Sequence, residues 1–212
     1  MQVVSDRVSI LNKDGIFSLV VLPFDKKWKI NLMFVWLLLW TISGVFYISL
    51  YVNASGEADF YRYQYDLAVK QNKKDVSVKI YKDIEKNQQK RLFIIGLLAF
   101  WAYFEYKVGK AFIFRKYGKE KLWIKNGMLF YQREVNKKGK IKEYNPQLIN
   151  DFEIIKANRG DFFVQMQESF WVIGAERLNF AYGSKTVKFG IQLNDKEAET
   201  IFKELKKELK KY

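Results

Sequence analysis

The chain contains one long stretch of uncharged and mostly apolar residues near its beginning. Between Lys29 and Glu57 it runs 27 residues without a charge. About 20 apolar residues are enough to cross a hydrocarbon core roughly 30 Å thick. The stretch therefore predicts a transmembrane helix over residues 30–52. A cleavable signal would begin its apolar part earlier and end in small residues, so we expect this helix to be kept as an anchor.

A second apolar stretch is interrupted by charges towards its end. Residues 92–104 carry no charge, but Glu105, Lys107 and Lys110 follow. Long lysine side chains reach the interface from the end of a span, so we expect a second transmembrane helix over 92–114. A functional Glu105, acting as a proton or ion ligand inside the membrane, is the alternative.

Both predicted spans have residues suited to the membrane–water interface. Tryptophan is enriched at that level, and lysine can extend its ammonium group to the headgroups. The interface anchors that we predict are Trp28, Lys29, Lys107 and Lys110.

The connection between the spans, residues 53–91, is polar but aromatic in its first part. Residues 75–91 have helical character, so we expect a partly helical loop that extends the second span. The aromatic residues are either interfacial anchors or a docking surface for a partner. These candidate partner contacts are Phe60, Tyr61, Tyr63 and Tyr65.

The parts before and after the spans show the alternation and turn signals of β-structure. Residues 1–29 predict a β-hairpin with runs at 8–11 and 16–22, followed by the approach to the membrane. In residues 115–212, Asn126-Gly127 is a strong hairpin signal. The predicted strands there are 121–125, 128–135, 148–156, 162–167, 178–182 and 186–193.

The chain closes with an amphipathic helix. Asn194 followed by Glu197 predicts a capping box. Acidic residues gather in its first turn and lysines in its last, which suits the helix dipole. Its apolar face predicts a helix packed on the preceding sheet rather than on a membrane.

Charge near the span ends predicts the orientation in the membrane. Ten lysines and arginines lie near the outer ends of the two spans, whereas the connecting loop begins with Glu57 and Asp59 and, of its nine cations, has Lys82, Lys86, Lys90 and Arg91 close to the second span. The positive-inside rule then favours both termini in the cytoplasm.

The amino-acid composition excludes several kinds of catalytic and metal site. The chain has no Cys and no His, which removes thiol chemistry, thiolate zinc sites and the commonest general base near neutral pH. No phosphate loop, nucleophile motif or metal-ligand pattern is present. We therefore expect no cofactor, no metal and no catalysis.

The net charge of +14 suits an anionic lipid surface, an acidic partner or simply solubility. The chain has no recognisable nucleic-acid reader motif, so we expect no nucleic acid partner. Clustered cations near a hairpin mouth predict candidate lipid-headgroup ligands, with a solvated hairpin tip as the alternative. These candidates are Lys137, Lys138, Lys140 and Lys142.

Two stretches resemble a family of bacterial integral membrane proteins that join two transmembrane helices to a PH-like domain. One is Pro23-Phe-Asp-Lys-Lys-Trp28 with Phe34, Trp36, Leu37 and Trp40, and the other runs from Phe180 to Gly190 with Leu193, Asp195, Glu197 and Ala198. The resemblance implies a PH-like barrel with a C-terminal capping helix. It also implies that the N-terminal hairpin packs with the C-terminal domain, with both chain ends on one side of the membrane.

The expected architecture is a membrane α-helical hairpin joined to an α+β, mainly-β PH-like barrel. The expected function is a non-catalytic accessory or scaffold subunit of a larger protein complex in the bacterial inner membrane, with membrane lipids and other membrane subunits as partners. The alternatives are a sensor of anionic lipid that uses the 137–142 lysines, and a membrane enzyme or transport component that uses Glu105.

Overall fold

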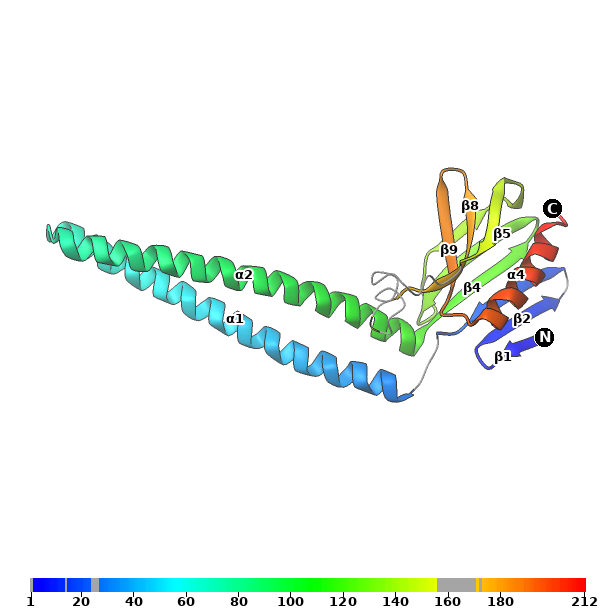
Figure 1. Ribbon diagram of the computed structural model, residues 1–212, viewed down its shortest axis with the longest axis horizontal. Coiled ribbons are helices and arrows are strands. Elements are labelled where there is room, and N and C mark those ends of the chain that lie inside the picture. The colour runs from blue at the N-terminus through cyan, green and yellow to red at the C-terminus, as the bar shows by residue number, and fades with distance from the viewer. Residues whose placement is uncertain (1, 14, 24–26, 156–170, 172) are drawn as a thin grey trace. The chain divides into compact units, whose positions relative to one another are not determined.

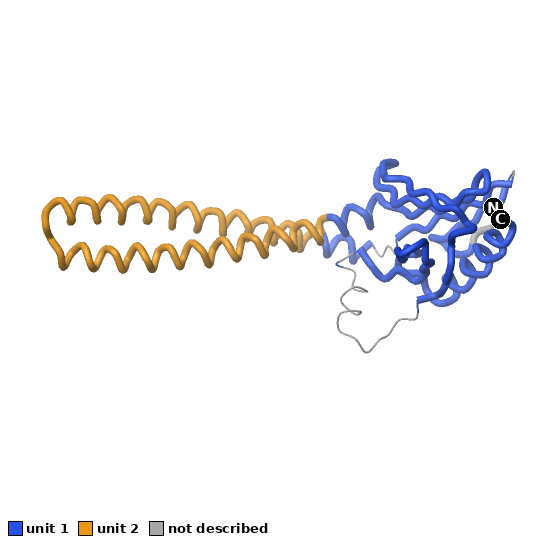
Figure 2. The backbone as a smooth tube through the Cα atoms, turned by 90° about the horizontal axis from the view of Figure 1, so that it is seen from above, with its two compact units in different colours: residues 1–33, 110–212 blue, residues 34–109 orange. Residues whose placement is uncertain are grey.

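The computed structural model of the chain describes residues 2–13, 15–23, 27–155, 171 and 173–212. These residues form two compact units (Figure 2). One unit consists of Met1–Met33 and Lys110–Tyr212, and the other is Phe34–Gly109. The first contains the strands and both chain termini, and the second contains most of a pair of long helices.

The helix pair consists of α1 (Lys27–Lys70) and α2 (Lys74–Tyr117), each 44 residues long (Figure 1). Both are long and apolar enough to cross a membrane, and the predicted spans 30–52 and 92–114 lie inside them. The predicted helical extension of the second span over 75–91 is confirmed, whereas residues 53–70 differ from the expected loop because α1 continues through them. Only residues 71–73 are non-helical, with Asn72 in the left-handed region at φ 57°.

The two helices pack along a seam whose residues alternate at spacings of three and four. This 3.5-residue period is that of a coiled coil, in which each inward side chain fits between residues of the facing helix. The seam continues through the polar part, where the inward residues of α1 are alanine or tyrosine and those of α2 include Ile80, Ile84 and the buried Asn87. In α1 they are Leu37, Trp40, Gly44, Tyr47, Tyr51, Ala54, Ala58, Tyr61, Tyr65 and Ala68. In α2 they are Ser77, Ile80, Ile84, Asn87, Arg91, Ile94, Leu98, Trp101, Glu105 and Val108.

The strands of the first unit form a six-stranded antiparallel sheet and a three-stranded antiparallel sheet. In spatial order the larger sheet contains β1 (Gln2–Ser5), β2 (Val8–Lys13), β3 (Ile16–Val21), β4 (Gly118–Lys125), β5 (Met128–Val135) and β6 (Ile141–Tyr144). The short helix η1 (Pro146–Leu148) leads to the smaller sheet, which contains β7 (Ile149–Ile154), β8 (Glu176–Tyr182) and β9 (Lys185–Ile191).

Strands from the two ends of the chain are direct neighbours in the larger sheet. β3 pairs with β4, and Phe17 lies opposite Ile124 while Leu19 lies opposite Leu122. The expected packing of the N-terminal hairpin with the C-terminal domain is confirmed. The helix pair is therefore an insertion between two adjacent strands.

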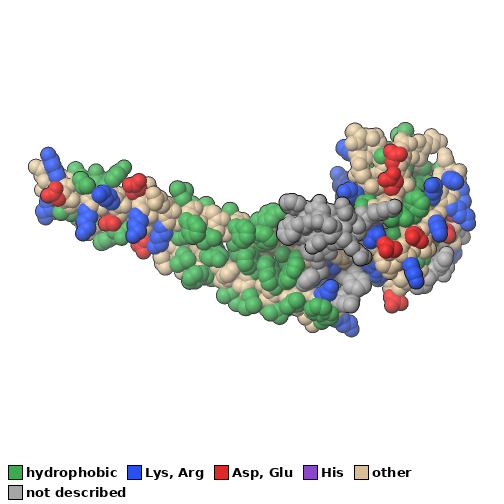
Figure 3. Space-filling model, in the orientation of Figure 1, with side chains coloured by type: hydrophobic (Ala, Val, Ile, Leu, Met, Phe, Trp, Pro, Cys, Tyr) green, Lys and Arg blue, Asp and Glu red, His purple; other side chains and the backbone are tan. Residues whose placement is uncertain are grey.

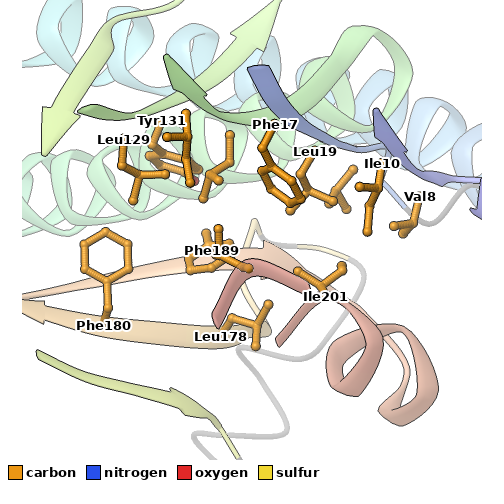
Figure 4. Packing of buried hydrophobic residues seen from close by; sticks show 14 of the residues in the cluster. Val8, Ile10, Phe17, Leu19, Leu129, Tyr131, Leu178, Phe180, Phe189 and Ile201 are labelled. Atoms are coloured by element: carbon orange, nitrogen blue, oxygen red, sulfur yellow. The ribbon is translucent and has the colours of Figure 1, made fainter. Parts of the chain in front are cut away.

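The two sheets face each other across one apolar core (Figure 4). Phe17, Leu19 and Leu129 project from the larger sheet towards Leu178, Phe180 and Phe189 of the smaller one. The C-terminal helix α4 (Asp195–Leu209) adds Ala198, Ile201 and Leu205, all fully buried. Its capping box is present, with Glu197 N–H donating to Asn194 Oδ1 at 2.8 Å and Asn194 N–H donating to Glu197 Oε2 at 2.9 Å. The predicted core role of this helix is confirmed.

The strand predictions differ from the structure in three places. β1 and β6 were not expected, and the described strands form two sheets rather than one closed barrel. The strand expected at 162–167 lies outside the described residues. The Asn126-Gly127 turn is confirmed, because both residues have positive φ angles, 50° and 74°, as a tight hairpin turn requires.

Candidate functional site

A groove of about 740 Å³ lies in the first unit, between residues of β5 and β6 and the β8–β9 hairpin. It opens where the larger sheet ends at β6 without pairing to the smaller sheet. Tyr131, Tyr144 and Tyr182 provide aromatic lining, while five cationic side chains lie around them. These cations are Arg133, Lys140, Lys142, Lys185 and Lys188.

The four groove lysines differ from Arg133 in their pairing. Arg133 donates to Glu120 Oε1 at 3.0 Å and to Glu176 Oε1 at 2.6 Å, so its charge is already balanced. Lys140, Lys142, Lys185 and Lys188 are exposed, and no carboxylate within the described part of the chain forms an ion pair with them. The groove therefore carries uncompensated positive charge.

A buried carboxylate holds the base of this region in place. Glu120 is 3% exposed and accepts hydrogen bonds from Tyr131 Oη at 2.7 Å and from the main-chain N–H groups of Gly190 and Ile191 at 2.8 and 2.9 Å. These bonds join β4 and β5 of one sheet to β9 of the other. Burial and the nearby Glu120 carboxylate raise the pKa of Tyr131 far above its ordinary value, so the phenol stays protonated and donates.

A second aromatic group at the groove is also kept neutral. Burial raises the pKa of Tyr144, and the neighbouring Tyr182 adds to the rise. The two rings meet edge to face with centroids 5.1 Å apart. The Tyr182 hydroxyl accepts the Asn145 N–H at 3.5 Å. Neutral phenols beside the lysines leave their positive charge intact.

The structure divides the four lysines that the sequence suggested as one cluster. Lys140 and Lys142 line the groove, whereas Lys137 and Lys138 do not. Asn136 and Lys137 are the two left-handed residues of a tight turn, and Val135 and Lys138 exchange main-chain hydrogen bonds across it. β6 begins only at Ile141, so Lys138 and Lys140 precede the strand that holds Lys142.

Sequence reasoning did not include Lys185 and Lys188 in this cluster. They follow the Gly183-Ser184 turn, more than 40 residues after Lys142 along the chain. Strand alternation from Lys185 to Lys188 gives no signal of a shared face. Only the facing of β6 and the β8–β9 hairpin brings these lysines to the same groove.

Each of the predicted interface anchors is placed on a helix. Trp28 is 60% exposed, with the Lys29 ammonium 5.6 Å from its ring centroid. The Lys107 ammonium lies 5.5 Å from the Tyr103 ring centroid. Lys110 is exposed on α2. The exposed positions of Trp28, Lys107 and Lys110 are those that an interface anchor needs.

The four aromatic residues after the first span separate onto two faces of α1. Tyr61 and Tyr65 occupy inward seam positions, and the ring of Tyr65 lies 6.3 Å from that of Tyr81 on α2. Phe60 and Tyr63 point outward and are 59% and 62% exposed. Of the four candidate partner contacts, only Phe60 and Tyr63 are therefore mostly exposed.

Glu105 occupies an inward seam position opposite α1. Its Oε1 lies 3.1 Å from the Thr41 hydroxyl oxygen, which also lies 2.8 Å from the main-chain oxygen of Leu37. Its Oε2 is buried and has no hydrogen-bond partner among the described residues. No group of three or more acidic residues in the described ranges is placed to hold a metal ion.

Comparisons with protein-family models, with curated proteins and with solved structures find no match to this chain.

Proposed function

We propose that this chain is a non-catalytic accessory or scaffold subunit of a larger membrane protein complex, anchored in the bacterial inner membrane by a helical hairpin. In this proposal its sheet unit is a PH-like module, a view favoured by two antiparallel sheets and a C-terminal helix around one core. The observation that carries the proposal is the insertion of a long apolar helix pair between the adjacent strands β3 and β4.

The exposure of the helices supports a membrane location. A core helix of a soluble protein is mostly buried, but only 11% of each candidate span is buried. Large apolar side chains face outward along both helices (Figure 3). Leu39, Ile42 and Leu92 are 63%, 65% and 69% exposed. In water, so large an apolar surface would be a strong liability, whereas lipid tails solvate it.

The sheet pairing supports an orientation with both termini on one side. Strands from before and after the helix pair share one sheet, which favours both ends of the pair on the same side of a bilayer. The excess of lysine and arginine near the outer ends of the spans favours the cytoplasm for that side.

The continuation of both helices beyond the apolar part supports docking of a partner on the far side. Phe60 and Tyr63 lie there on the outward face, and aromatic residues are enriched in the centres of protein interfaces. Near these residues, polar contacts join the two helices to each other. Glu57 Oε2 accepts hydrogen bonds from Asn87 Nδ2 at 3.1 Å and from Lys90 Nζ at 2.9 Å.

The test is purification of the full chain from its own membranes in mild detergent, followed by identification of stoichiometric partners. The variant Phe60→Ala/Tyr63→Ala should lose such a partner. The control Val69→Ala/Val78→Ala changes two residues of the same helix pair that are also exposed, and it should retain the partner. Recovery of the wild-type chain alone, or equal loss by both variants, would refute the docking surface.

Orientation is tested separately by cysteine labelling, because the chain has no cysteine of its own. Single cysteines at Ser9 and at Asn72 should react with an impermeant maleimide from opposite sides of the membrane. Glu105→Gln should leave partner recovery unchanged, and a loss there would favour the membrane enzyme or transport alternative.

A further inference from the structure

The groove between β6 and the β8–β9 hairpin brings four lysines that form no ion pair with the described residues to one space. Elsewhere in the described parts of this unit, several cations beside the strands are paired with carboxylates, while Lys13 and Lys125 stand singly at strand ends. Arg7 pairs with Glu197, Lys119 and Lys121 with Glu134, and Arg177 with Asp195. In the groove, four lysines share one carboxylate that is not already engaged, Glu143.

We propose that this groove binds an anion whose phosphate oxygens carry more than one negative charge. A phosphate group has several strong acceptor oxygens, and lysines bind it as flexible point charges. Lysines from two separate hairpins converge on the same space, so one ligand can contact both. The inference does not depend on the scaffold proposal, since it concerns only the sheet unit.

The size of the groove limits the ligand to a small molecule or one headgroup. Ligand pockets usually measure about 300–1,000 Å³, and this one measures about 740 Å³. That space accommodates an oligophosphate or a phosphorylated lipid headgroup but not a nucleic acid duplex. The neutral phenols of Tyr131 and Tyr144 and the hydroxyl of Thr186 add groups that do not repel an anion.

The base of the groove is held rigid without the ligand. Arg133 is tied to Glu120 and Glu176, and Glu120 is tied to the main chain of β9. A lysine substitution at the rim therefore removes charge without breaking the contacts that join the sheets. This property makes the site testable by variants that keep their fold.

The experiment compares two double variants of the full chain that each remove two positive charges. Lys142→Ala/Lys188→Ala removes one groove lysine from each side, and Lys137→Ala/Lys138→Ala removes two exposed lysines of the neighbouring turn outside the groove. One arm measures binding of inorganic tripolyphosphate to the chain in neutral detergent by calorimetry. The other arm places the chain in nanodiscs that contain both lipids and measures how much phosphatidic acid the chain retains relative to phosphatidylcholine.

We expect the groove variant to lose at least about tenfold in affinity in one arm or the other, because two charge contacts are removed. The turn variant should stay within about twofold of wild type. Loss in the tripolyphosphate arm alone assigns a soluble phosphate ligand, and loss in the lipid arm identifies a headgroup. Equal losses by both variants, or binding by the wild type in neither arm, would overturn the proposal. Circular dichroism of each variant verifies that the fold is retained.

Discussion

Trp40 and Trp101 donate their indole N–H groups to each other's main-chain carbonyl oxygens across the helix pair. The Trp40 Nε1 to Trp101 oxygen distance is 3.2 Å, and the Trp101 Nε1 to Trp40 oxygen distance is 2.8 Å. The Trp101 ring also covers Gly44, where an added Cβ would lie 2.2 Å from Trp101 Cε2. The largest side chain of the seam thus fits against its smallest residue, which lets the two helices exchange polar contacts inside an apolar stretch.

The first prediction concerns this fit. Gly44→Ala should destabilise the helix pair by about 1–3 kcal/mol, the usual cost of overpacking, because the new methyl group would overlap the Trp101 ring. Gly96→Ala is the control, since nothing lies within 4 Å of an added Cβ there. It should be neutral or stabilising by up to about 1 kcal/mol through better helix propensity. Thermal unfolding in detergent measures both, and equal midpoints would refute the close contact.

The second prediction concerns the carboxylate that joins the sheets. Glu120→Gln should cost about 3–5 kcal/mol, because it leaves Arg133 and two main-chain N–H groups of β9 with a weaker acceptor in a buried place. Glu153→Gln, on an exposed position of β7, should change stability by less than about 0.5 kcal/mol. Denaturant unfolding of the two variants tests this difference, and a small effect at Glu120 would contradict the assigned role.

The third prediction is a pH dependence. Burial acts to raise the pKa of Glu197, but hydrogen bonds from the Arg7 guanidinium, the Asn194 N–H and the Ser5 hydroxyl outweigh it and hold this pKa below its ordinary value. The carboxylate therefore contributes stability that is present above the unfolded pKa of about 4.3 and is lost as the pH falls through the lower folded value. The melting temperature should therefore fall as the pH is lowered below about 5.

Two glutamine variants separate this group from general acid effects. Glu197→Gln should flatten the loss of melting temperature in acid, because the titrating group is gone. Glu199→Gln changes an exposed residue on the same helix and should keep the wild-type slope. Identical slopes for wild type and Glu197→Gln would show that the Arg7 contact carries no linked proton.

The fourth prediction compares two partners of Glu57 in the helix pair. Asn87 is 4% exposed and donates to Glu57 from within the seam, whereas the Lys90–Glu57 ion pair is about half exposed on both sides. Asn87→Ala should cost about 1 kcal/mol or more, and Lys90→Ala only about 0–1 kcal/mol because solvent screens the pair. The unfolding midpoints of the two variants measure this difference. A larger loss of stability for Lys90→Ala than for Asn87→Ala would contradict the prediction.

Local signals in the sequence were sufficient where neighbouring residues decide the structure. Met128–Val135 has the predicted bounds, and the Asn126-Gly127 turn and the Asn194–Glu197 capping box form as expected. Each depends on contacts within a few residues. β6 does not stand out in the sequence, because two of its four residues, Lys142 and Glu143, are charged and the strand gains its geometry from pairing with β5.

Only part of the candidate site could be predicted from the sequence, because the rest depends on contacts between distant segments. Lys140 and Lys142 could be named from their local clustering, but Lys185 and Lys188 join them through the packing of two distant hairpins. Lys137 and Lys138 belonged to the same run of lysines, yet the tight turn at Asn136 and Lys137 places them elsewhere. Clustering along a chain does not determine which side chains share a space when a turn intervenes.

The sequence by itself determined the two apolar spans, the β-rich ends and the capped final helix, because hydrophobic runs, alternation and capping act over short distances. Only the tertiary structure decided that α1 continues to Lys70, that Phe60 and Tyr63 face outward while Tyr61 and Tyr65 lie inward, and that β3 lies beside β4. These outcomes depend on which surfaces meet across the helix pair and across the sheet. The residues of one partner do not specify which surface of the other they will meet.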